Sequence, residues 1–392
     1  MRPITRRPSV GLFTYSTLPR GSVVHAAALA DALTDAGWDA TLYALDKDGR
    51  GFFRPLRAKV CLVPAASSPP TTLELVRVRA RELATYLSRH RPRHDVFHAQ
   101  DCLSANGLLE ARARGCDVTL VRTVHHVERF DDPHLAACQR RSILDADLCL
   151  AVSEDTRADV ALGFGVETPV VGNGVDARRF EHVAPDRLAA VRERYGDGGP
   201  VVLAVGGVEP RKNTTRLLEA FLRLRARHPG ARLWILGGAT VLDHGAYRAT
   251  FERVLAGADE ATRRAVVELG VVPDEDVPAI FARADVLASP SSHEGFGLSA
   301  LEGLAARLPV VASARAPFTE FLDETCAVLV DPLSVEAIAD GLERALADAR
   351  RLSLAGRERA RAHGWDRVAA RHAEHYERII ADAGDALHRS LA

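Results

Sequence analysis

Short apolar runs alternate along this chain with longer segments of helical period. In the longer segments, such as 23–36 and 73–89, apolar side chains recur every three or four residues, which predicts amphipathic helices. Runs rich in Val, Leu and Ile between such helices are typical of parallel strands covered on both faces of a sheet. The strands expected in the first half are 10–16, 40–45, 59–64, 95–100, 118–125, 148–153 and 169–171. The strands expected in the second half are 201–206, 232–237, 265–269, 285–289, 309–313 and 327–330.

A polar connection separates the two halves of this pattern and ends in the glycine-rich break at 195–200. The pattern therefore predicts an α/β protein with two Rossmann-like, doubly wound parallel-sheet domains, 1–182 and 199–364. Such domains face a cleft and bind ligands at the carboxyl ends of their strands. The remaining segment, 365–392, is expected to form a long amphipathic helix that packs back toward the N-terminal domain.

Composition and charge exclude several function classes. Of the 392 residues, 47% are hydrophobic and 26% are charged, and the formal net charge is −1. Such a chain is globular and has no global attraction to nucleic acid or to an anionic membrane. The six cysteines lack metal-binding spacing, the start of the chain lacks the pattern of a signal peptide, and no run approaches the roughly 18 apolar residues of a membrane span. We therefore expect a cytoplasmic protein without stable membrane insertion.

The segment 284–303 carries the most informative pattern. A strand is expected to end at Ser289, a loop with Glu294 follows, and a helix is expected to start near Gly297. Glycines beside a helix N-terminus let backbone N–H groups approach a phosphate, and the helix dipole favours its negative charge. Glu294 would lie beside that phosphate and Glu302 about two turns into the helix, where carboxylates can accept hydrogen bonds from sugar hydroxyls. The bare spacing of two glutamates is common on solvated helices, so the prediction depends on the strand, loop and helix around them.

A second segment carries two adjacent cations. Arg211 and Lys212 follow the strand expected at 201–206 and precede a helix. The chain has only three lysines, so a lysine in this position is notable. Cations there can neutralise a diphosphate leaving group. The alternative interpretation is a solvated Arg-Lys pair at the start of a helix.

These motifs closely resemble those of the family 4 retaining glycosyltransferases of the GT-B fold, which carry a PSxxEGFGLxxLEA motif followed by a PVV strand. The resemblance runs from the first strand to about residue 332. It implies that Glu294 contacts the donor sugar, that Glu302 contacts the nucleotide ribose, and that Lys212 is the family lysine. The usual family arginine falls on Gly207, and Arg211 is expected to supply the missing charge. The remaining donor-binding residues that the resemblance implies are Gly295, Phe296, Gly297, Leu298 and Ser299.

The resemblance extends to the first half. The family has a Gly-Gly loop after its first strand, and this chain has Gly21 and Ser22 at that place. This loop is not a GxGxxG fingerprint, so a dinucleotide-binding domain loses its main support. A Thr-x-His at a strand end matches His125, which the resemblance implies helps to orient the transferred sugar. The neighbouring His126 is interpreted mainly as a surface residue, and His25 as a packing residue that stays a candidate.

The resemblance thus implies a hexosyltransferase that moves a sugar from a nucleotide-diphosphate sugar to a hydroxyl acceptor by a front-face displacement with retention. It implies no metal and no other cofactor. The acceptor is open among small molecules, glycans and lipids, and the sequence indicates neither the donor base nor the oligomeric state. Two alternatives remain. One is a non-catalytic nucleotide-sugar-binding protein, and the other is a metal-dependent transferase that uses one of the DxD patterns at 46–48 and 145–147.

Overall fold

The computed structural model describes residues 7–66, 69, 71–238 and 244–391 and, of these, the side chains up to residue 382. The chain forms two compact units. Unit 1 comprises Met1–Gly174 and Trp365–Ala392, and unit 2 comprises Val175–Gly364. Unit 2 begins at Val175, before the domain end expected at residue 182, and the Val175 N–H donates to the carbonyl oxygen of His363 at 2.9 Å.

In the described part of unit 1, six parallel strands form a sheet in the order β3-β2-β1-β4-β5-β6. The strands are β1 (Ser9–Thr14), β2 (Asp39–Asp46), β3 (Lys59–Pro64), β4 (Val96–Ala99), β5 (Leu120–Val124) and β6 (Leu148–Ala151). The strand expected at 169–171 is reduced to an isolated bridge between Val170 and Ala151. Its short length follows in part from Pro169, which has no N–H to donate to a ladder.

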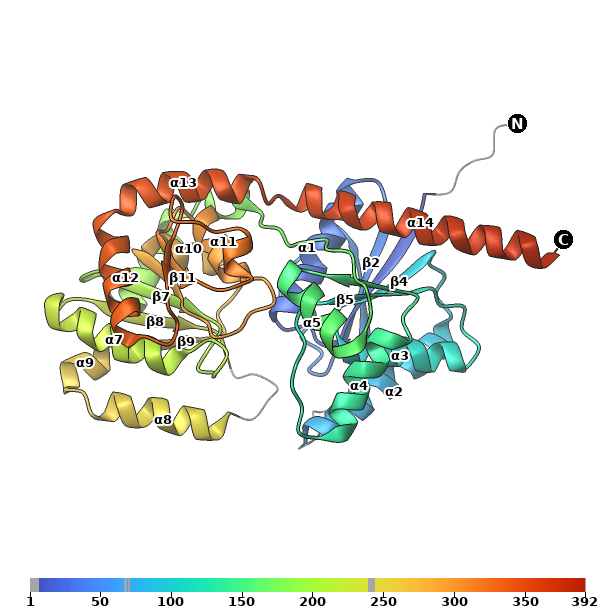
Figure 1. Cartoon of the computed structure of the whole chain (residues 1–392), viewed down its shortest axis with the longest axis horizontal. Coiled ribbons are helices and arrows are strands. Elements are labelled where there is room, and N and C mark those ends of the chain that lie inside the picture. Colours follow the sequence, from blue (N-terminus) through green and yellow to red (C-terminus); the bar gives the residue numbers. More distant parts are fainter. Residues whose placement is uncertain (1–6, 67–68, 70, 239–243, 392) are drawn as a thin grey trace. The chain divides into compact units, whose positions relative to one another are not determined.

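Helices cover this sheet and several begin with a side-chain cap. Asp101, Asp132 and Ser153 each accept a backbone N–H in the first turn of the helix that follows. The last helix, α14, packs against the first, α1, and Figure 1 shows the two side by side. The helices are α1 (Gly21–Asp35), α2 (Thr72–His90), α3 (Cys102–Ala113), α4 (Pro133–Leu144), α5 (Glu154–Phe164) and α14 (Trp365–Leu391).

The α14 helix is part of the core of unit 1. Val368, Ala369, His372 and Tyr376 are all 0% exposed. The Arg371 Nε also donates to the carbonyl oxygen of Val171 at 2.7 Å, which ties the helix to the segment after β6. Apolar burial and this hydrogen bond therefore join α14 to unit 1, although nearly 200 residues separate it from the rest of that unit.

In the described part of unit 2, six parallel strands form a second sheet in the order β12-β11-β10-β7-β8-β9. They are β7 (Val201–Val205), β8 (Arg232–Leu236), β9 (Val266–Gly270), β10 (Val286–Ser289), β11 (Val310–Ser313) and β12 (Val328–Val330). The helices are η1 (Ala177–Phe180), α6 (Pro185–Tyr195), α7 (Thr214–Arg227), α8 (Gly245–Ala256), α9 (Glu260–Ala265), α10 (Val277–Arg283), α11 (Leu298–Ala305), η2 (Phe318–Glu320), α12 (Val335–Ala347) and α13 (Ala349–Arg361).

The structure confirms the predicted class of two Rossmann-like, doubly wound parallel sheets. Central strands in both units are almost fully buried, as expected for sheets that helices cover on both faces. Within the described residues, no helix combines the length and the apolar character that crossing a membrane requires.

Candidate functional site

Two loops of unit 2 meet at one edge of its sheet because the strands before them are neighbours. β7 pairs with β10, with Val202 opposite Val286. The loop after each strand therefore leaves from the same edge. Hydrogen bonds join the two loops directly: the Ser292 N–H donates to the Arg211 carbonyl oxygen at 2.9 Å, and the Asn213 side chain donates to the Pro290 carbonyl oxygen at 2.9 Å.

This arrangement brings Arg211, Lys212 and Glu294 together. The Lys212 Nζ donates to Glu294 Oε1 at 2.6 Å, and the Arg211 guanidinium donates to Glu294 Oε2. The hydroxyl of Ser291 donates to Glu294 Oε1 at 2.9 Å. The Glu294 carboxylate, only 6% exposed, is thus surrounded by donors from both loops.

A second carboxylate belongs to this cluster. The Arg211 guanidinium also donates to Glu209 Oε1 at 2.8 Å, and Glu209 is 4% exposed. Two cations and two carboxylates make the cluster of Arg211, Lys212, Glu209 and Glu294 formally neutral. Neither Glu209 nor Ser291 was among the site residues predicted from the sequence. Both are only two or three residues from a predicted site residue, so their position along the chain was the available signal.

The electrostatics of the cluster keep Glu294 ionised. Burial by itself raises the pKa of a carboxyl group, because it removes the charged form from water. Arg211 and Lys212, together with the hydrogen bonds from Lys212 and Ser291, outweigh that effect and lower the pKa of Glu294 to about 2. The carboxylate is therefore a fixed negative charge that orients two cations at neutral pH.

The glycines after β7 let the chain pass close to Lys212. Gly206 and Gly207 both have positive φ angles, +132° and +83°. A Cβ atom on Gly206 would lie 2.4 Å from Lys212 Cε, and one on Gly207 would lie 2.8 Å from the Gly238 carbonyl oxygen. A side chain at either position would therefore strain the loop. Gly207, which has a positive φ angle, stands where an arginine was expected, and the guanidinium beside Lys212 comes from Arg211.

The N-terminus of α11 lies directly after Glu294. Gly297 caps the helix with φ +99°, and a Cβ atom there would lie 2.5 Å from the Phe318 ring. The first N–H groups of a helix have no partner within the helix. The Ser299 hydroxyl is buried and has no hydrogen-bond partner among the described residues. Phe296 stacks on Phe321 with ring centroids 4.8 Å apart, while Gly295 and Leu298 are half-buried.

Glu302 lies farther along α11, with its side chain 20% exposed. Arg179, from η1, has Nη1 at 4.0 Å from Glu302 Oε1 and donates from Nη2 to Asp274 Oδ1 at 2.6 Å. Arg179 was not among the site residues predicted from the sequence, because no local motif indicates that η1 lies beside α11.

Unit 1 holds the remaining predicted residues at the carboxyl ends of its strands. Gly21 and Ser22 form the start of α1, which follows β1. Gly21 is exposed, and a Cβ atom there would meet no atom within 4 Å. The fold therefore does not require glycine at this position.

His125 follows the last residue of β5 and is half-buried. Its Nε2 lies 3.0 Å from the Gln100 side-chain oxygen, and its ring lies edge-on to the His25 ring with centroids 4.7 Å apart. Burial, with His25 next in effect, holds the pKa of His125 well below its usual value. His25 is fully buried, and its Nδ1 lies 3.0 Å from Asn173 Oδ1. His126 is exposed, and its Nε2 lies 3.3 Å from Glu128 Oε2.

The two DxD patterns have local structural roles. Asp46 accepts the backbone N–H of Gly51 at 3.0 Å and so closes the turn after β2. Asp147 accepts the backbone N–H of Leu120 at 2.7 Å and pairs with Arg112. Asp147 precedes β6, so it lies at the amino end of that strand.

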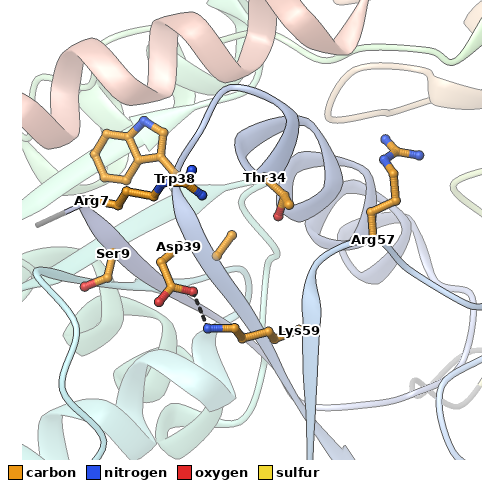
Figure 2. A pocket seen from close by; sticks show the side chains of 8 residues that line it. Arg7, Ser9, Thr34, Trp38, Asp39, Arg57 and Lys59 are labelled. Atoms are coloured by element: carbon orange, nitrogen blue, oxygen red, sulfur yellow. Dashed lines mark hydrogen bonds and ion pairs between the residues drawn. The ribbon is translucent and has the colours of Figure 1, made fainter.

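A cavity of about 340 Å³ lies in unit 1, and Figure 2 shows the side chains that line it. It opens at the amino ends of β1, β2 and β3, where Lys59 Nζ lies 2.7 Å from Asp39 Oδ1. Its lining residues are Arg7, Ser9, Thr34, Trp38, Asp39, Ala40, Arg57 and Lys59. Parallel α/β sheets bind ligands at the carboxyl ends of their strands, so this cavity is not the predicted site.

Comparisons with known proteins agree with the motifs. The family model described as Glycosyl transferases group 1 matches residues 191–363, and that described as Glycosyltransferase Family 4 matches residues 19–179. The chain is 35% identical over 303 residues to a GDP-mannose-dependent alpha-(1-6)-phosphatidylinositol monomannoside mannosyltransferase of Mycolicibacterium smegmatis, covering 73% of this chain and 76% of that protein.

Solved structures show the same fold. Sucrose-phosphate synthase from Thermosynechococcus elongatus matches with a TM-score of 0.77 at 22% identity, over 96% of this chain and 100% of that one. Anabaena Alr3699/HepE in complex with UDP-glucose matches with a TM-score of 0.71 at 17% identity, over 94% and 99% of the two chains.

The chain belongs to the family 4 glycosyltransferases and has the GT-B fold. It is a glycosyltransferase. The structure brings Arg211, Lys212 and Glu294 together in unit 2, beside the start of α11. Gly21, Ser22 and His125 belong to unit 1.

Proposed function

We propose that this protein transfers a hexose from a nucleoside-diphosphate sugar to a hydroxyl acceptor with retention of anomeric configuration and without a metal ion. The observation that carries the proposal is the cluster of half-buried Arg211 and Lys212 around the buried Glu294 carboxylate, directly before the N-terminus of α11. This arrangement combines fixed positive side chains with backbone N–H groups, which is the chemistry that a diphosphate requires.

The diphosphate in this proposal lies against the backbone N–H groups at residues 297–299. The buried Ser299 hydroxyl, which has no partner among the described residues, supports this placement because it can donate to a phosphate oxygen. The positive end of the helix dipole adds to the attraction. Glu302, farther along α11, accepts hydrogen bonds from the ribose hydroxyls, and Arg179 Nη1 lies 4.0 Å from its carboxylate.

The chemical step breaks the bond between the anomeric carbon and the phosphate oxygen. Negative charge then grows on the departing diphosphate, where Lys212 and Arg211 stabilise it. The acceptor hydroxyl attacks from the same face of the sugar, and the departing phosphate takes its proton, so the step needs no separate base. Glu294 holds both cations in place before the donor arrives, which avoids a reorganisation cost during the reaction.

The donor is a nucleoside diphosphate carrying glucose or mannose. The relative from Mycolicibacterium smegmatis is named as dependent on GDP-mannose, and the Anabaena structure contains UDP-glucose. The acceptor, which we propose binds unit 1, carries a hydroxyl group and is otherwise unassigned.

A thermal-shift panel of UDP-glucose, GDP-mannose and ADP-glucose tests donor binding. A donor at about 100 times its Kd adds roughly 2.7 kcal/mol of stability. The bound donor is then incubated with the enzyme in excess EDTA, and the anomer of the released or transferred sugar is read by proton NMR. Retention in the presence of EDTA supports the proposal. No shift with any donor, inversion, or complete loss of turnover in EDTA would contradict it.

Slow hydrolysis of the donor, with water as acceptor, separates an enzyme from a binding protein. We expect the wild type to hydrolyse its donor and the Lys212→Met variant to bind a donor without hydrolysing it at a comparable rate. Equal, background-level hydrolysis by both proteins would favour a non-catalytic nucleotide-sugar-binding protein.

A further inference from the structure

A chain of buried polar side chains leads from α14 to His125 within unit 1. The Tyr376 hydroxyl oxygen lies 2.5 Å from His98 Nδ1, and the Thr123 hydroxyl oxygen lies 2.7 Å from His98 Nε2. The Gln100 side-chain nitrogen lies 3.1 and 3.3 Å from the two His98 ring nitrogens, and its side-chain oxygen lies 3.0 Å from His125 Nε2. The other four side chains of this hydrogen-bonded series, Tyr376, His98, Thr123 and Gln100, are at most 1% exposed.

The chemistry of the Gln100 oxygen assigns the proton on His125. An amide oxygen can only accept a hydrogen bond, so His125 Nε2 must be the donor. A neutral imidazole with its proton on Nε2 carries a lone pair on Nδ1. The pKa of His125 lies well below its usual value, because the ring is buried and His25 and Arg122 are nearby, so the ring is neutral at pH 7.

His98 lies beside the Gln100 amide and is itself held by two hydroxyl groups. Both ring nitrogens of His98 have hydroxyl partners, so the ring cannot turn without breaking two buried hydrogen bonds. Burial also lowers the pKa of His98 well below its usual value, which keeps that ring neutral. Beside this fixed ring, the Gln100 side-chain nitrogen lies next to His98 and its oxygen lies next to His125.

We propose that Gln100 is a positioning residue that fixes His125 as the Nε2–H tautomer, so that Nδ1 accepts a hydrogen bond from a hydroxyl of the transferred sugar. This inference rests on the proposed function. A neutral acceptor suits that role, because the sugar ring gains positive character as its bond to the phosphate breaks. A protonated imidazole would oppose that charge and would offer no lone pair.

Imidazole NMR of the full chain labelled with 15N-histidine tests the tautomer without requiring any activity. The His125→Asn variant assigns the signals. We expect wild-type His125 to be neutral at pH 7, with a lone pair on Nδ1 and a slowly exchanging proton on Nε2. Gln100→Leu should lose that slow exchange. A wild-type His125 that is protonated on Nδ1 or on both nitrogens, or an unchanged spectrum in Gln100→Leu, would overturn the inference.

Kinetics then test the effect on transfer. Gln100→Leu should lower kcat about tenfold, because the loss of one hydrogen bond worth about 1.4 kcal/mol changes a rate by that factor. Its affinity for the nucleoside diphosphate alone should be unchanged. Tyr376→Phe should lower kcat less. Tyr86→Phe is the matched control, because its hydroxyl lies 3.0 Å from Cys61 Sγ in the same unit and outside the chain of contacts to His125.

The rate of transfer by Gln100→Glu, measured as a function of pH, is a further test. This variant also replaces Gln100→Leu if that variant fails to fold. A carboxylate in contact with His125 should raise the pKa of the ring while preserving the Nε2–H bond, because it favours the protonated form. As the pH is lowered, the rate of transfer should therefore begin to fall at a higher pH in Gln100→Glu than in the wild type. An identical pH profile for both proteins would contradict the inference. Absence of transfer by the wild type would instead contradict the proposed function, and the NMR result would still stand.

Discussion

Replacing Glu294 with Gln removes the carboxylate that holds Arg211 and Lys212 and keeps the size of the side chain. Glu294 is 6% exposed, so two cations would lose their shared buried partner. Removing one partner of a buried ion pair costs about 3–5 kcal/mol. The fall of the Glu294 pKa from 4.5 to about 2 corresponds to about 3 kcal/mol at about 1.36 kcal/mol per unit. Arg211 keeps Glu209, so we expect a loss of about 3 kcal/mol of unfolding free energy at pH 7.

The direction of the Glu294 pKa shift determines how this loss of stability depends on pH. A carboxyl group whose pKa is lower in the folded protein stabilises the fold above its unfolded pKa and loses that contribution as the pH falls toward its folded pKa. The difference between the wild type and Glu294→Gln should therefore be largest at neutral pH. It should shrink as the pH falls from about 5 toward 2, provided that both proteins remain folded in the absence of urea.

Urea unfolding followed by fluorescence measures this difference. Trp234 is fully buried and is the tryptophan of unit 2, so Trp38→Phe and Trp365→Phe in both proteins make it the reporter for that unit. Glu268→Gln is the matched control, because its ion pair with Arg248 is about 40% exposed and should contribute at most about 1 kcal/mol. Equal urea midpoints for Glu294→Gln and the wild type, or a difference that does not change with pH, would refute the reasoning.

Three further predictions concern other parts of the two units. Lys212→Met should lower kcat about 10²–10³-fold in a transfer assay, because it removes a positive group at the leaving diphosphate, and a rate near that of the wild type would contradict this. Gly297→Ala should lower the unfolding free energy by at least about 1–3 kcal/mol in urea, since its φ is +99° and its Cβ atom would lie 2.5 Å from the Phe318 ring, whereas Gly21→Ala should change it by less than about 0.5 kcal/mol. Burial lowers the pKa of His25 from 6.5 to about 4, so the unfolding free energy of unit 1 should fall as the pH drops from 6.5 to 4, and His25→Gln should show a shallower slope.

Most of the strands could be predicted from the sequence because parallel strands buried on both faces are continuous apolar runs. β3 was predicted at its observed bounds, and the other strands differ mainly at their ends. The segment at 169–171 was the exception. Its apolar residues follow the same pattern, yet Pro169 and the short length leave a single bridge at Val170. The pattern of apolar residues does not predict how many residues of a run pair with a neighbouring strand.

The individual site residues were visible as local motifs, but their contacts were not. That Glu294 contacts the donor sugar stays a prediction. The contact of its carboxylate with Lys212, which lies 82 residues earlier, could not be predicted from the sequence. That contact exists because β7 and β10 are neighbours, and strand order is a property of the whole sheet. The contact of Arg179 with Glu302 likewise depends on the packing of η1 beside α11.

The roles of His98 and Gln100 could not be predicted from the sequence either, because their contacts depend on the whole fold. They lie on a predicted strand as ordinary polar residues, and only the fold shows that the Tyr376 hydroxyl, 278 residues from His98, completes their hydrogen bonds. A helix at the end of the chain could be predicted from its period. Its role in holding buried polar groups beside His125 could not.

A crystal structure of the protein with a bound nucleoside diphosphate would be the decisive measurement. We predict that its phosphates lie within hydrogen-bond distance of the backbone N–H groups at 297–299 and of Lys212 Nζ, with the ribose hydroxyls at Glu302. A nucleotide bound elsewhere, with the start of α11 covered by side chains and Lys212 turned away from the phosphates, would contradict the proposal.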